Sequence, residues 1–548
     1  MRIFDGRDMK TLIILKKTSG ILVLTIAFVG SVWLQMRNIV NAIEGELARD
    51  LGKLKLVLIS ALNEAPVRKA NDHRINEVKA MPVKYVSFSI SAVTSLAGLL
   101  ALLGMGAMAQ PIALVGGQLV DGYEATPIHD SIVLIEGDTI TAAGPAHAIT
   151  VPEDAHVIDT RGRTVMPGLI DLHVHMEIIG HGDYGVYQDF IGDDRDKLRL
   201  VREIAAKQSL RAGVTTVVDM GSTFEILETR ERVAAGEIPG PRVVASGPWI
   251  SRLHLPEILP EDAQLVISSP QEAAARTVEL IERGVDVIKA WVGLTRADYA
   301  AIVREAHARG VKVHAHLYEP EQIRKAIDAG VDVLQHMGSA KNPAYDHDLV
   351  MEIAHKDLPV VQTIAHRIWV YPATVAFPTR LEDPLLREDL PPDWYAEFQR
   401  SFEQFHRLDY FREVEREMRL ARVACRQFIE ADAVNGVGTD AGSPMNFHSE
   451  AMWREMSALV DCGMSPAQAI TAATKTNAEI LSDMALLGGA RRFGTIEPGM
   501  LADIIVVEGD PRFDIEALND VVLTIKEGMP WFTARNATAT LQEIGQQF

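Results

Sequence analysis

Two histidines, His173 and His175, stand one residue apart at the end of the apolar segment 168–172. Side chains at positions i and i+2 of a strand point to the same side, so a strand here would turn both imidazoles toward one point. Two such imidazoles are a common clamp for a divalent metal ion. The pair alone also fits a polar strand end, so the metal interpretation depends on the residues that end the other apolar segments.

Other apolar segments also end in residues of metal-binding type, namely Lys289, His316, His336 and Asp440. Chance would hardly place only such residue types at equivalent positions, so the sequence predicts a metal site built from all six residues. The sequence holds two cysteines, Cys425 and Cys462, which are too few for a thiolate cluster. The ligands must therefore be nitrogen and oxygen atoms.

Lys289 is the unusual member of this set. A protonated ammonium beside two dications would be repelled, and a buried lysine loses its proton readily. A neutral amine can add carbon dioxide, and the resulting carbamate is a carboxylate with one oxygen for each of two metals. The alternative is a lysine that is paired with a nearby acid.

His314 and His316 lie two residues apart and would point the same way, so only one of them need be a ligand. We favour His316 because of its spacing to the next helix and to His336. His314 would then orient a ligand through a hydrogen bond.

Other polar residues near the predicted strand ends are weaker candidates for substrate binding. One group follows the first strand, where the alternative is a polar loop that hydrogen-bonds to itself; it consists of His181, Asp183 and Tyr184. A second group could bind a substrate carboxylate, with arginine suited to bidentate contact; it consists of Tyr318, His366 and Arg367.

A repeated unit must position these residues. Predicted helices over 195–212, 270–284, 296–309, 319–330 and 346–356, and one ending near Ala433, each precede an apolar, β-branched strand. Strands over 167–176 and 241–247 bring the number to eight, which predicts a closed (β/α)₈ TIM barrel over 167–493. Active sites of such barrels lie at the carboxyl ends of the strands, where the six predicted ligands stand.

Two flanks and one insertion complete the predicted organisation. Segments 110–166 and 494–535 have alternating apolar residues punctuated by Gly and Asp, which predicts short strands that pair into one composite β-sandwich. The stretch 366–411 is rich in Pro, Trp, Tyr and Phe and follows the seventh strand. We expect it to form a lid or substrate wall, with a peripheral insertion as the alternative.

Several motifs together resemble the amidohydrolase superfamily over residues 112–532: PGLIDLHVH, VIK, HAHLYEPEQIRKAIDAGVDVLQH, GTDAG and GTIEPGMLADIIVV. The lysine on the fourth strand and the spacing of 20 residues from His316 to His336 resemble the imidazolonepropionase-like branch. That branch includes prolidase-like dipeptidases and ochratoxinase, which cleave amide bonds beside a carboxylate. The Gln335-His336-Met337 context differs from the Glu-His-Gly common in the branch, which leaves the shape of the pocket open.

The resemblance implies a binuclear centre, commonly of zinc. His173, His175 and Asp440 would hold one metal, His316 and His336 the other, and carbamylated Lys289 would bridge them together with a hydroxide. The hydroxide would attack the carbonyl of a small-molecule amide, with Asp440 as general base and then acid. The alternatives are a phosphotriesterase-type or lactonase-type ester hydrolase on the same centre, and a non-catalytic small-molecule binding protein.

The charge distribution bears on partners and location. A net charge of −20 argues against nucleic acid as a partner, and a homo-oligomer is compatible with the sequence. Residues 1–80 differ from the rest because they carry 13 Lys and Arg against 8 Asp and Glu. We predict that they are an upstream extension, untranslated or disordered.

The segment 81–109 resembles a secretory signal. Met81 and Lys84 precede an apolar run, and Ala107-Met108-Ala109 stands before Gln110 as a cleavage site would. We therefore expect translation to start at Met81 and the product to be periplasmic or secreted. A start at Met1 would instead favour an inner-membrane anchor over the apolar run 21–34.

Overall fold

The computed structural model describes residues 110–192, 194–255, 260–338, 344–376, 378–405, 414–482 and 492–532. The predicted upstream extension and the signal-like segment lie outside these residues. None of the helices in the described part of the chain is long and apolar enough to cross a membrane.

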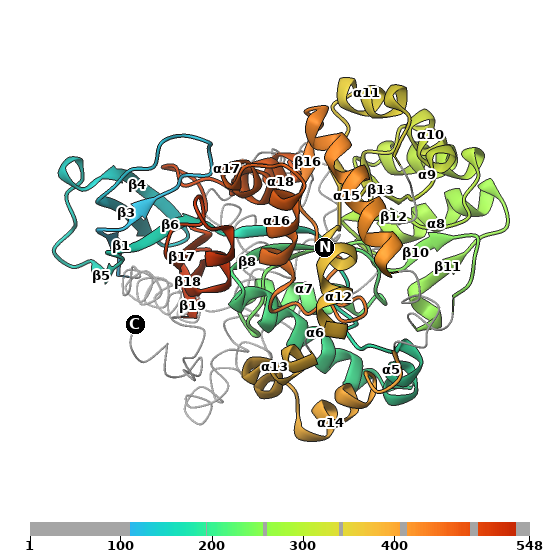
Figure 1. The fold of residues 1–548 in the computed structure, drawn as a ribbon, viewed down its shortest axis with the longest axis horizontal. Helices are drawn as coiled ribbons and strands as arrows, with labels where there is room; N and C mark the ends of the chain where they lie inside the picture. The colour runs from blue at the N-terminus through green and yellow to red at the C-terminus, as the bar shows by residue number, and fades with distance from the viewer. Residues whose placement is uncertain are drawn as a thin grey trace, which may run out of the picture. The chain divides into compact units, whose positions relative to one another are not determined.

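The predicted alternation of strands and helices is present between the two flanks (Figure 1). Eight strands correspond to the predicted ones: β7 (Leu169–Val174), β8 (Val214–Asp219), β9 (Arg242–Ala245), β12 (Val287–Ala290), β13 (Lys312–His316), β14 (Val333–Gln335), β15 (Val360–Val361) and β16 (Asn435–Gly436). The helices between and after them are α5 (Tyr184–Ile191), α6 (Arg195–Arg211), α7 (Ile226–Ala234), α8 (Pro270–Glu282), α9 (Arg296–His307), α10 (Pro320–Ala329), α11 (His347–His355), α15 (Val414–Glu430), α16 (Ala451–Asp461), α17 (Pro466–Thr471), η7 (Ala472–Thr476) and α18 (Asn477–Leu481).

Local sequence explains where these helices begin. The Ser269 side chain accepts a hydrogen bond from the backbone of Glu272 at the start of α8, and Pro270 occupies the first turn, where no intrahelical N–H is needed. Thr295 and Asp298 form a reciprocal capping box at the start of α9. Each cap fixes the first turn of a helix that leads to the next strand.

The parallel strands form two sheets, one of order β7-β8-β9 and one of order β11-β10-β12-β13-β14-β15-β16. The second contains two short strands that were not predicted, β10 (Trp249–Ser251) and β11 (Gln264–Val266), the latter preceded by η2 (Glu261–Ala263). The pairing therefore does not run as one continuous ladder around a closed barrel within the described residues.

Irregular contacts join the two sheets at both junctions. Between β9 and β12, Asp286 N donates to the Ala245 carbonyl at 2.8 Å, and the Asp286 carboxylate accepts from Ala245 N at 2.9 Å. Beyond β16, Leu172 N donates to the Val437 carbonyl at 3.0 Å, and Val174 bridges to Ala441. Regular strand pairing is thus replaced by contacts of Asp286 at the first junction and by contacts of the segment after β16 at the second.

The two flanks form two further sheets. Their strands are β1 (Ile112–Val115), β2 (Gln118–Leu119), β3 (Ser131–Glu136), β4 (Thr139–Pro145), β5 (His156–Asp159), β6 (Arg163–Pro167), β17 (Ile504–Glu508), β18 (Val521–Lys526) and β19 (Met529–Phe532), with η1 (Ala146–Ala148) and η9 (Ile515–Asn519) in the connections. The orders are β4-β3-β1-β5 and β19-β18-β17-β6-β2, so the second sheet mixes strands from both flanks. Side chains of both sheets share one hydrophobic cluster, which includes Leu114, Val133, Val165 and Val506.

The aromatic-rich insertion is largely helical in its described part. It contains η3 (His366–Val370), α12 (Tyr371–Ala376), η4 (Pro378–Glu382), α13 (Pro384–Asp389) and α14 (Pro392–Arg400). Its buried Phe398 and Phe402 belong to the same hydrophobic cluster as Tyr187 and Phe447, which lie in loops and helices beyond the strand ends. The region of α14 therefore packs over the loop that follows β7, whereas Asp389 at the end of α13 pairs with Arg211, before β8 begins.

Candidate metal centre

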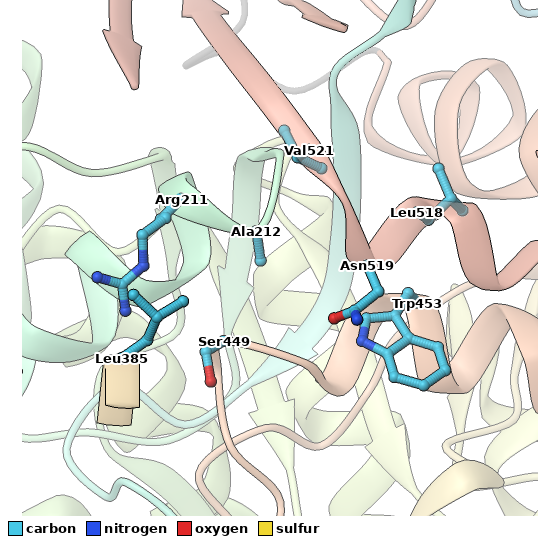
Figure 2. Close-up of a pocket in the computed structure, with 8 residues that line it drawn as sticks. All are labelled: Arg211, Ala212, Leu385, Ser449, Trp453, Leu518, Asn519 and Val521. Carbon is cyan, nitrogen blue, oxygen red and sulfur yellow. The ribbon is translucent and has the colours of Figure 1, made fainter. Parts of the chain in front are cut away.

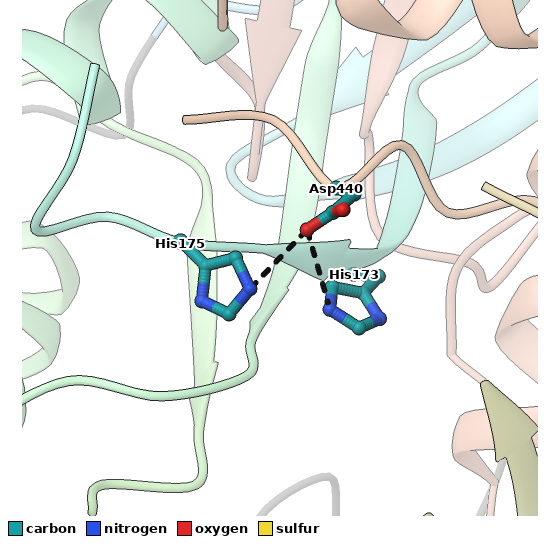
Figure 3. A group of neighbouring side chains, drawn as sticks. All are labelled: His173, His175 and Asp440. Atoms are coloured by element: carbon teal, nitrogen blue, oxygen red, sulfur yellow. Dashed lines mark ion pairs between the residues drawn. The ribbon is translucent and has the colours of Figure 1, made fainter. Parts of the chain in front are cut away.

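His173, His175 and Asp440 form a compact cluster, shown in Figure 3. The Asp440 Oδ1 atom lies 3.3 Å from His175 Nε2 and 3.7 Å from His173 Nε2. One ligand atom from each residue lies within 4.8 Å of the other two, and all three residues are buried. The i, i+2 geometry expected of the first strand thus brings both imidazoles to the carboxylate that follows the eighth strand.

Three residues beyond the strand ends adopt a left-handed backbone conformation that non-glycine residues seldom take. The φ angles are 64° at His336, 47° at Thr363 and 61° at Asp440. Such conformations are costly, and they persist where the surrounding structure imposes them, often at functional sites. Here they turn the chain directly after the strands β14 and β15 and in the loop after β16.

His336 and His316 extend the cluster. The His336 ring centroid lies 4.4 Å from that of His173 and 4.3 Å from that of His316. The Nδ1 atom of His336 lies 2.9 Å from the Thr363 hydroxyl oxygen, so a neighbouring side chain orients this ring. The five imidazole and carboxylate groups are thus contiguous.

Lys289 is almost fully buried, and its Nζ has no hydrogen-bond partner among the described residues. Burial lowers the pKa of this amine from 10.5 to about 7, although Asp440 and Asp219 oppose the shift. A substantial neutral fraction is therefore present near pH 7, as carbamate formation requires.

The electrostatics favour neutral rings around an ionised carboxylate. Burial and the charge of Lys289 lower the pKa of His173 well below its ordinary value, and burial does the same to His336. Burial alone would raise the pKa of Asp440, but contacts with His175 and His366 outweigh it and hold that pKa well below the usual value. Neutral imidazoles and a carboxylate are the protonation states that bind metal ions.

His366 and Arg367 lie beside the second carboxylate oxygen. The His366 Nδ1 atom is 3.3 Å from Asp440 Oδ2, and Arg367 Nη1 is 2.8 Å from the same nitrogen. Its Nε2 lies 3.0 Å from the Pro444 carbonyl oxygen, which only accepts, so the proton of the neutral ring sits on Nε2 and the Nδ1 lone pair accepts from Arg367. His366 was considered from the sequence only as a substrate contact, yet its position is next to the proposed proton carrier.

The weaker candidates divide between the centre and its surroundings. The Tyr318 ring packs edge-on against His316 at 4.6 Å between centroids, at the centre itself. His181 lies 2.8 Å from the Glu397 carboxylate of α14, so it contacts the insertion. Asp183 accepts from Gly185 N at the start of α5, and Tyr184 begins that helix, which favours the self-bonding loop for this pair.

Two features of the centre were not predicted. Asp219, the last residue of β8, accepts from Met176 N at 2.8 Å and so fixes the chain directly after His175. The same strand-end rule that identified the other residues applies to its position. Trp249 and Trp291 stack with their ring centroids 3.9 Å apart, and they lie nearly perpendicular to His175 and His316 at centroid distances of 6.3 Å and 5.9 Å respectively. They form an aromatic wall that no spacing signal in the sequence marks.

A small hollow elsewhere is separate from this centre. It lies beside Ala212, before β8 begins, with Arg211, Leu385 and Trp453 in its wall (Figure 2). The predicted ligands stand at the opposite ends of the strands, so the hollow takes no part in the chemistry considered below.

The residues present fit a metal centre. His173 Nε2 and Lys289 Nζ are buried polar atoms without a hydrogen-bond partner among the described residues, as expected of atoms whose partner is an ion or a modification. Imidazole nitrogens with a carboxylate are a donor set suited to zinc and other divalent transition metals.

Residues 164–530 match the Amidohydrolase family. The enamidase of Eubacterium barkeri is 28% identical over 208 residues, which cover 36% of this chain and 48% of the enamidase. The imidazolonepropionase of Haloarcula marismortui is 32% identical over 103 residues, 17% of this chain and 24% of that protein. The chain thus matches about half or less of the length of these relatives.

A solved Xaa-Pro dipeptidase with bound methionine superposes with a TM-score of 0.60 at 23% identity, covering 77% of this chain and 100% of that one. At that identity the likeness concerns the fold, which is of the TIM-barrel type. Together the matches confirm the predicted family and its imidazolonepropionase-like branch, and they agree with the prediction that the chain is an enzyme.

Proposed function

The chain belongs to the amidohydrolase family, and from this premise we propose that it is a metal-dependent hydrolase that cleaves a carbon–nitrogen bond of a small-molecule amide or dipeptide-like substrate. The observation that carries the proposal is the cluster in which His173 and His175 meet Asp440 within 4.8 Å. The names of the relatives, an enamidase, an imidazolonepropionase and a dipeptidase, point to the same bond type.

The residues divide between two metal positions in this proposal. His173, His175 and Asp440 would hold one ion, and His316 and His336 the other, with a carbamate on Lys289 between them. The centroid separations of 4.3 Å and 4.4 Å around His336 support two adjacent positions. Zinc is the proposed metal because imidazole and carboxylate donors suit it.

When bound, such cations supply Lewis acidity that polarises a carbonyl and makes a water more acidic. Asp440 accepts the proton of the attacking water as the new carbon–oxygen bond forms. It then delivers that proton to the leaving nitrogen as the carbon–nitrogen bond breaks. Ser443 Oγ, which donates to Asp440 Oδ1 at 2.8 Å, orients this carboxylate during both transfers.

The substrate is small in this proposal. His175 and Asp440 are 8% and 7% exposed, so little of the centre is accessible. The stacked Trp249 and Trp291 offer an apolar wall, and Arg367 offers a cation next to the centre for a substrate carboxylate.

We infer that the two parallel sheets are one eight-stranded barrel, supported by the backbone contacts at both junctions. The flank sheets would form a β-sandwich, supported by their shared cluster. Export through the segment 81–109, with Gln110 as the first mature residue, remains our proposal for location.

The test is metal analysis by plasma emission spectroscopy together with an amide assay. The wild type should contain about two zinc equivalents and cleave members of a panel of N-acyl amino acids and dipeptides. Lys289→Ala should lose metal and activity. Lys312→Ala is the matched control and should keep both. Lys312 stands at the amino end of β13, away from the centre, and its ammonium donates a hydrogen bond to the Ile480 carbonyl. Metal content indifferent to Lys289 would contradict the bridged centre.

A further inference from the structure

A buried glutamine connects two histidines of the centre. Gln335 ends β14, and its Oε1 lies 2.8 Å from His173 Nδ1. Its Nε2 lies 3.0 Å from His314 Nδ1 and 3.5 Å from the Leu172 carbonyl oxygen. A carbonyl only accepts hydrogen bonds, so the Leu172 contact supports the orientation that turns the amide nitrogen toward His314.

The amide therefore sets a different tautomer on each ring. Its oxygen only accepts, so His173 carries its proton on Nδ1 and keeps a lone pair on Nε2, the atom that faces Asp440. Its nitrogen only donates, so His314 presents a lone pair on Nδ1. The proton of this ring must then sit on Nε2, which makes His314 a donor at its far side.

The far side of His314 lies next to Lys289. The two residues are register partners on the adjacent parallel strands β13 and β12, so their side chains stand side by side on one face. His314 Nε2 and Lys289 Nζ are both buried, and neither has a hydrogen-bond partner among the described residues. A buried N–H without an acceptor is unfavourable, so this arrangement calls for an acceptor on the lysine.

We propose that Gln335 fixes His314 as the hydrogen-bond donor to a carbamate on Lys289, and that this donor holds the carbamate in the orientation the centre needs. The inference rests on the proposed function, which supplies the carbamate. In its formation the neutral amine adds carbon dioxide, a nitrogen–carbon bond forms, and one proton leaves the nitrogen for solvent. A carbamate oxygen then accepts from His314 Nε2–H.

The variant Gln335→Leu removes the donor to His314 without adding a charge. Nothing then keeps the Nδ1 of His314 unprotonated, so the tautomer with its lone pair on Nε2, facing the carbamate, becomes populated. Gln362→Leu is the matched control, because Gln362 is also buried beyond a strand end but donates to Asn435 Oδ1 at 2.9 Å.

The experiment supplies ¹³C-labelled bicarbonate and follows the carbamate signal by ¹³C NMR, with zinc content measured on the same samples. Label should appear on the wild type and on Gln362→Leu. In Gln335→Leu the equilibrium constant for uptake should fall about ten-fold, as expected when one hydrogen bond to a charged group is lost. Equal uptake in Gln335→Leu and the wild type would overturn the role of Gln335 and leave the proposed function intact.

Absence of label from the wild type would overturn both the carbamate and the present inference, whereas amide hydrolysis by that protein would still support the broader function. A second measurement guards against a misfolded variant. In the wild type, ¹⁵N NMR should find His314 protonated on Nε2, and a proton on Nδ1 would overturn the assignment. His314→Gln, which keeps an acceptor and a donor, should retain label that His314→Leu loses.

Discussion

Asp440 faces the imidazoles of His173 and His175 with one carboxylate oxygen and His366 with the other. Its backbone has a left-handed φ of 61°. Asparagine tolerates that backbone conformation better than most residues, and its side chain has nearly the same shape as aspartate. Asp440→Asn therefore removes the proton acceptor with little change to the backbone.

We expect turnover of Asp440→Asn to fall by about 10²–10⁴-fold, the range for loss of a general acid–base group. Metal should remain bound through the histidines. Asp432→Asn is the control, since Asp432 also has a positive φ, of 54°, in the turn before the same strand. Near-normal turnover of Asp440→Asn, measured on the best substrate of the panel, would refute the assignment.

Glu455 shows how a remote carboxyl supports the site. Its two oxygens accept from Ile364 N at 2.9 Å and Ala365 N at 2.7 Å, directly before His366. Burial raises its pKa from 4.5 to about 8, although these hydrogen bonds oppose the shift. A raised carboxyl pKa favours folding while the group is protonated, so this contribution is present below about pH 4.5 and is lost as the pH rises toward 8.

The glutamine at this position in Glu455→Gln does not titrate, so its stability lacks that pH dependence. The free energy of unfolding of the wild type minus that of Glu455→Gln should therefore decrease from pH 5 to pH 8.5. Urea unfolding of metal-free protein at both pH values measures the difference. Parallel pH profiles for the two proteins would show that Glu455 does not titrate in this window.

That the predicted ligands lie close together was predictable from position, because each of them occupies or follows the carboxyl end of a strand. Their partners were not, since they depend on contacts between distant segments. Glu455 belongs to a helix about 90 residues after the backbone groups that it binds. Nothing in its local sequence marks it.

At the scale of elements, the insertion is held against the loop after β7 by one buried pair. His181 Nε2 lies 2.8 Å from Glu397, both side chains are at most 3% exposed, and Ser401 Oγ accepts from Gly182 N at 2.9 Å. These contacts tie α14 to the loop that follows the two metal-facing histidines. Breaking the pair should loosen the insertion without touching a proposed ligand.

We expect Glu397→Leu, which removes the acceptor, to raise KM more than it lowers kcat, since the insertion would spend more time undocked. Hydrogen exchange of α14 should accelerate in parallel. Glu403→Leu, an exposed position in the same insertion, should change neither quantity. Unchanged exchange in Glu397→Leu would mean that aromatic packing alone docks the helix.

The long helices and apolar strands were predictable from periodicity, as α6, α8, α9 and α10 illustrate. The short strands β10 and β11 were missed because three residues carry no usable period. The helices of the insertion were missed for a different reason, since they are short and the prolines in the segment are typical of loops. Each of its helices α13 and α14 begins at a proline.

At the scale of the molecule, the proposed ligands come from strands all around the parallel sheets. Bound metal would therefore link β7, β12, β13, β14 and the segment after β16. A ligand that binds only the folded state stabilises it by about 4 kcal/mol when its free concentration is 1,000 times its Kd. Removal of metal by a chelator should consequently lower Tm, and added zinc should restore it.

Calorimetry on two histidine variants distinguishes a specific effect from a general one. His173→Ala should show no chelator-dependent change in Tm. His307→Ala, which removes a surface histidine paired with Asp332 at 2.9 Å, should respond as the wild type does. A response that persists in His173→Ala would place the stabilising metal elsewhere.

The pairing of β6 with β17 has a consequence for the timing of synthesis. Arg163 and Glu508, which face each other in this pair, are 345 residues apart. At translation rates of about 5–20 residues per second, the edge of β6 waits about 20–70 seconds for its partner to emerge. An unpaired strand edge invites association with other chains during that interval. This flank therefore stays open while the barrel is being made, although its first strands are synthesised before the barrel strands.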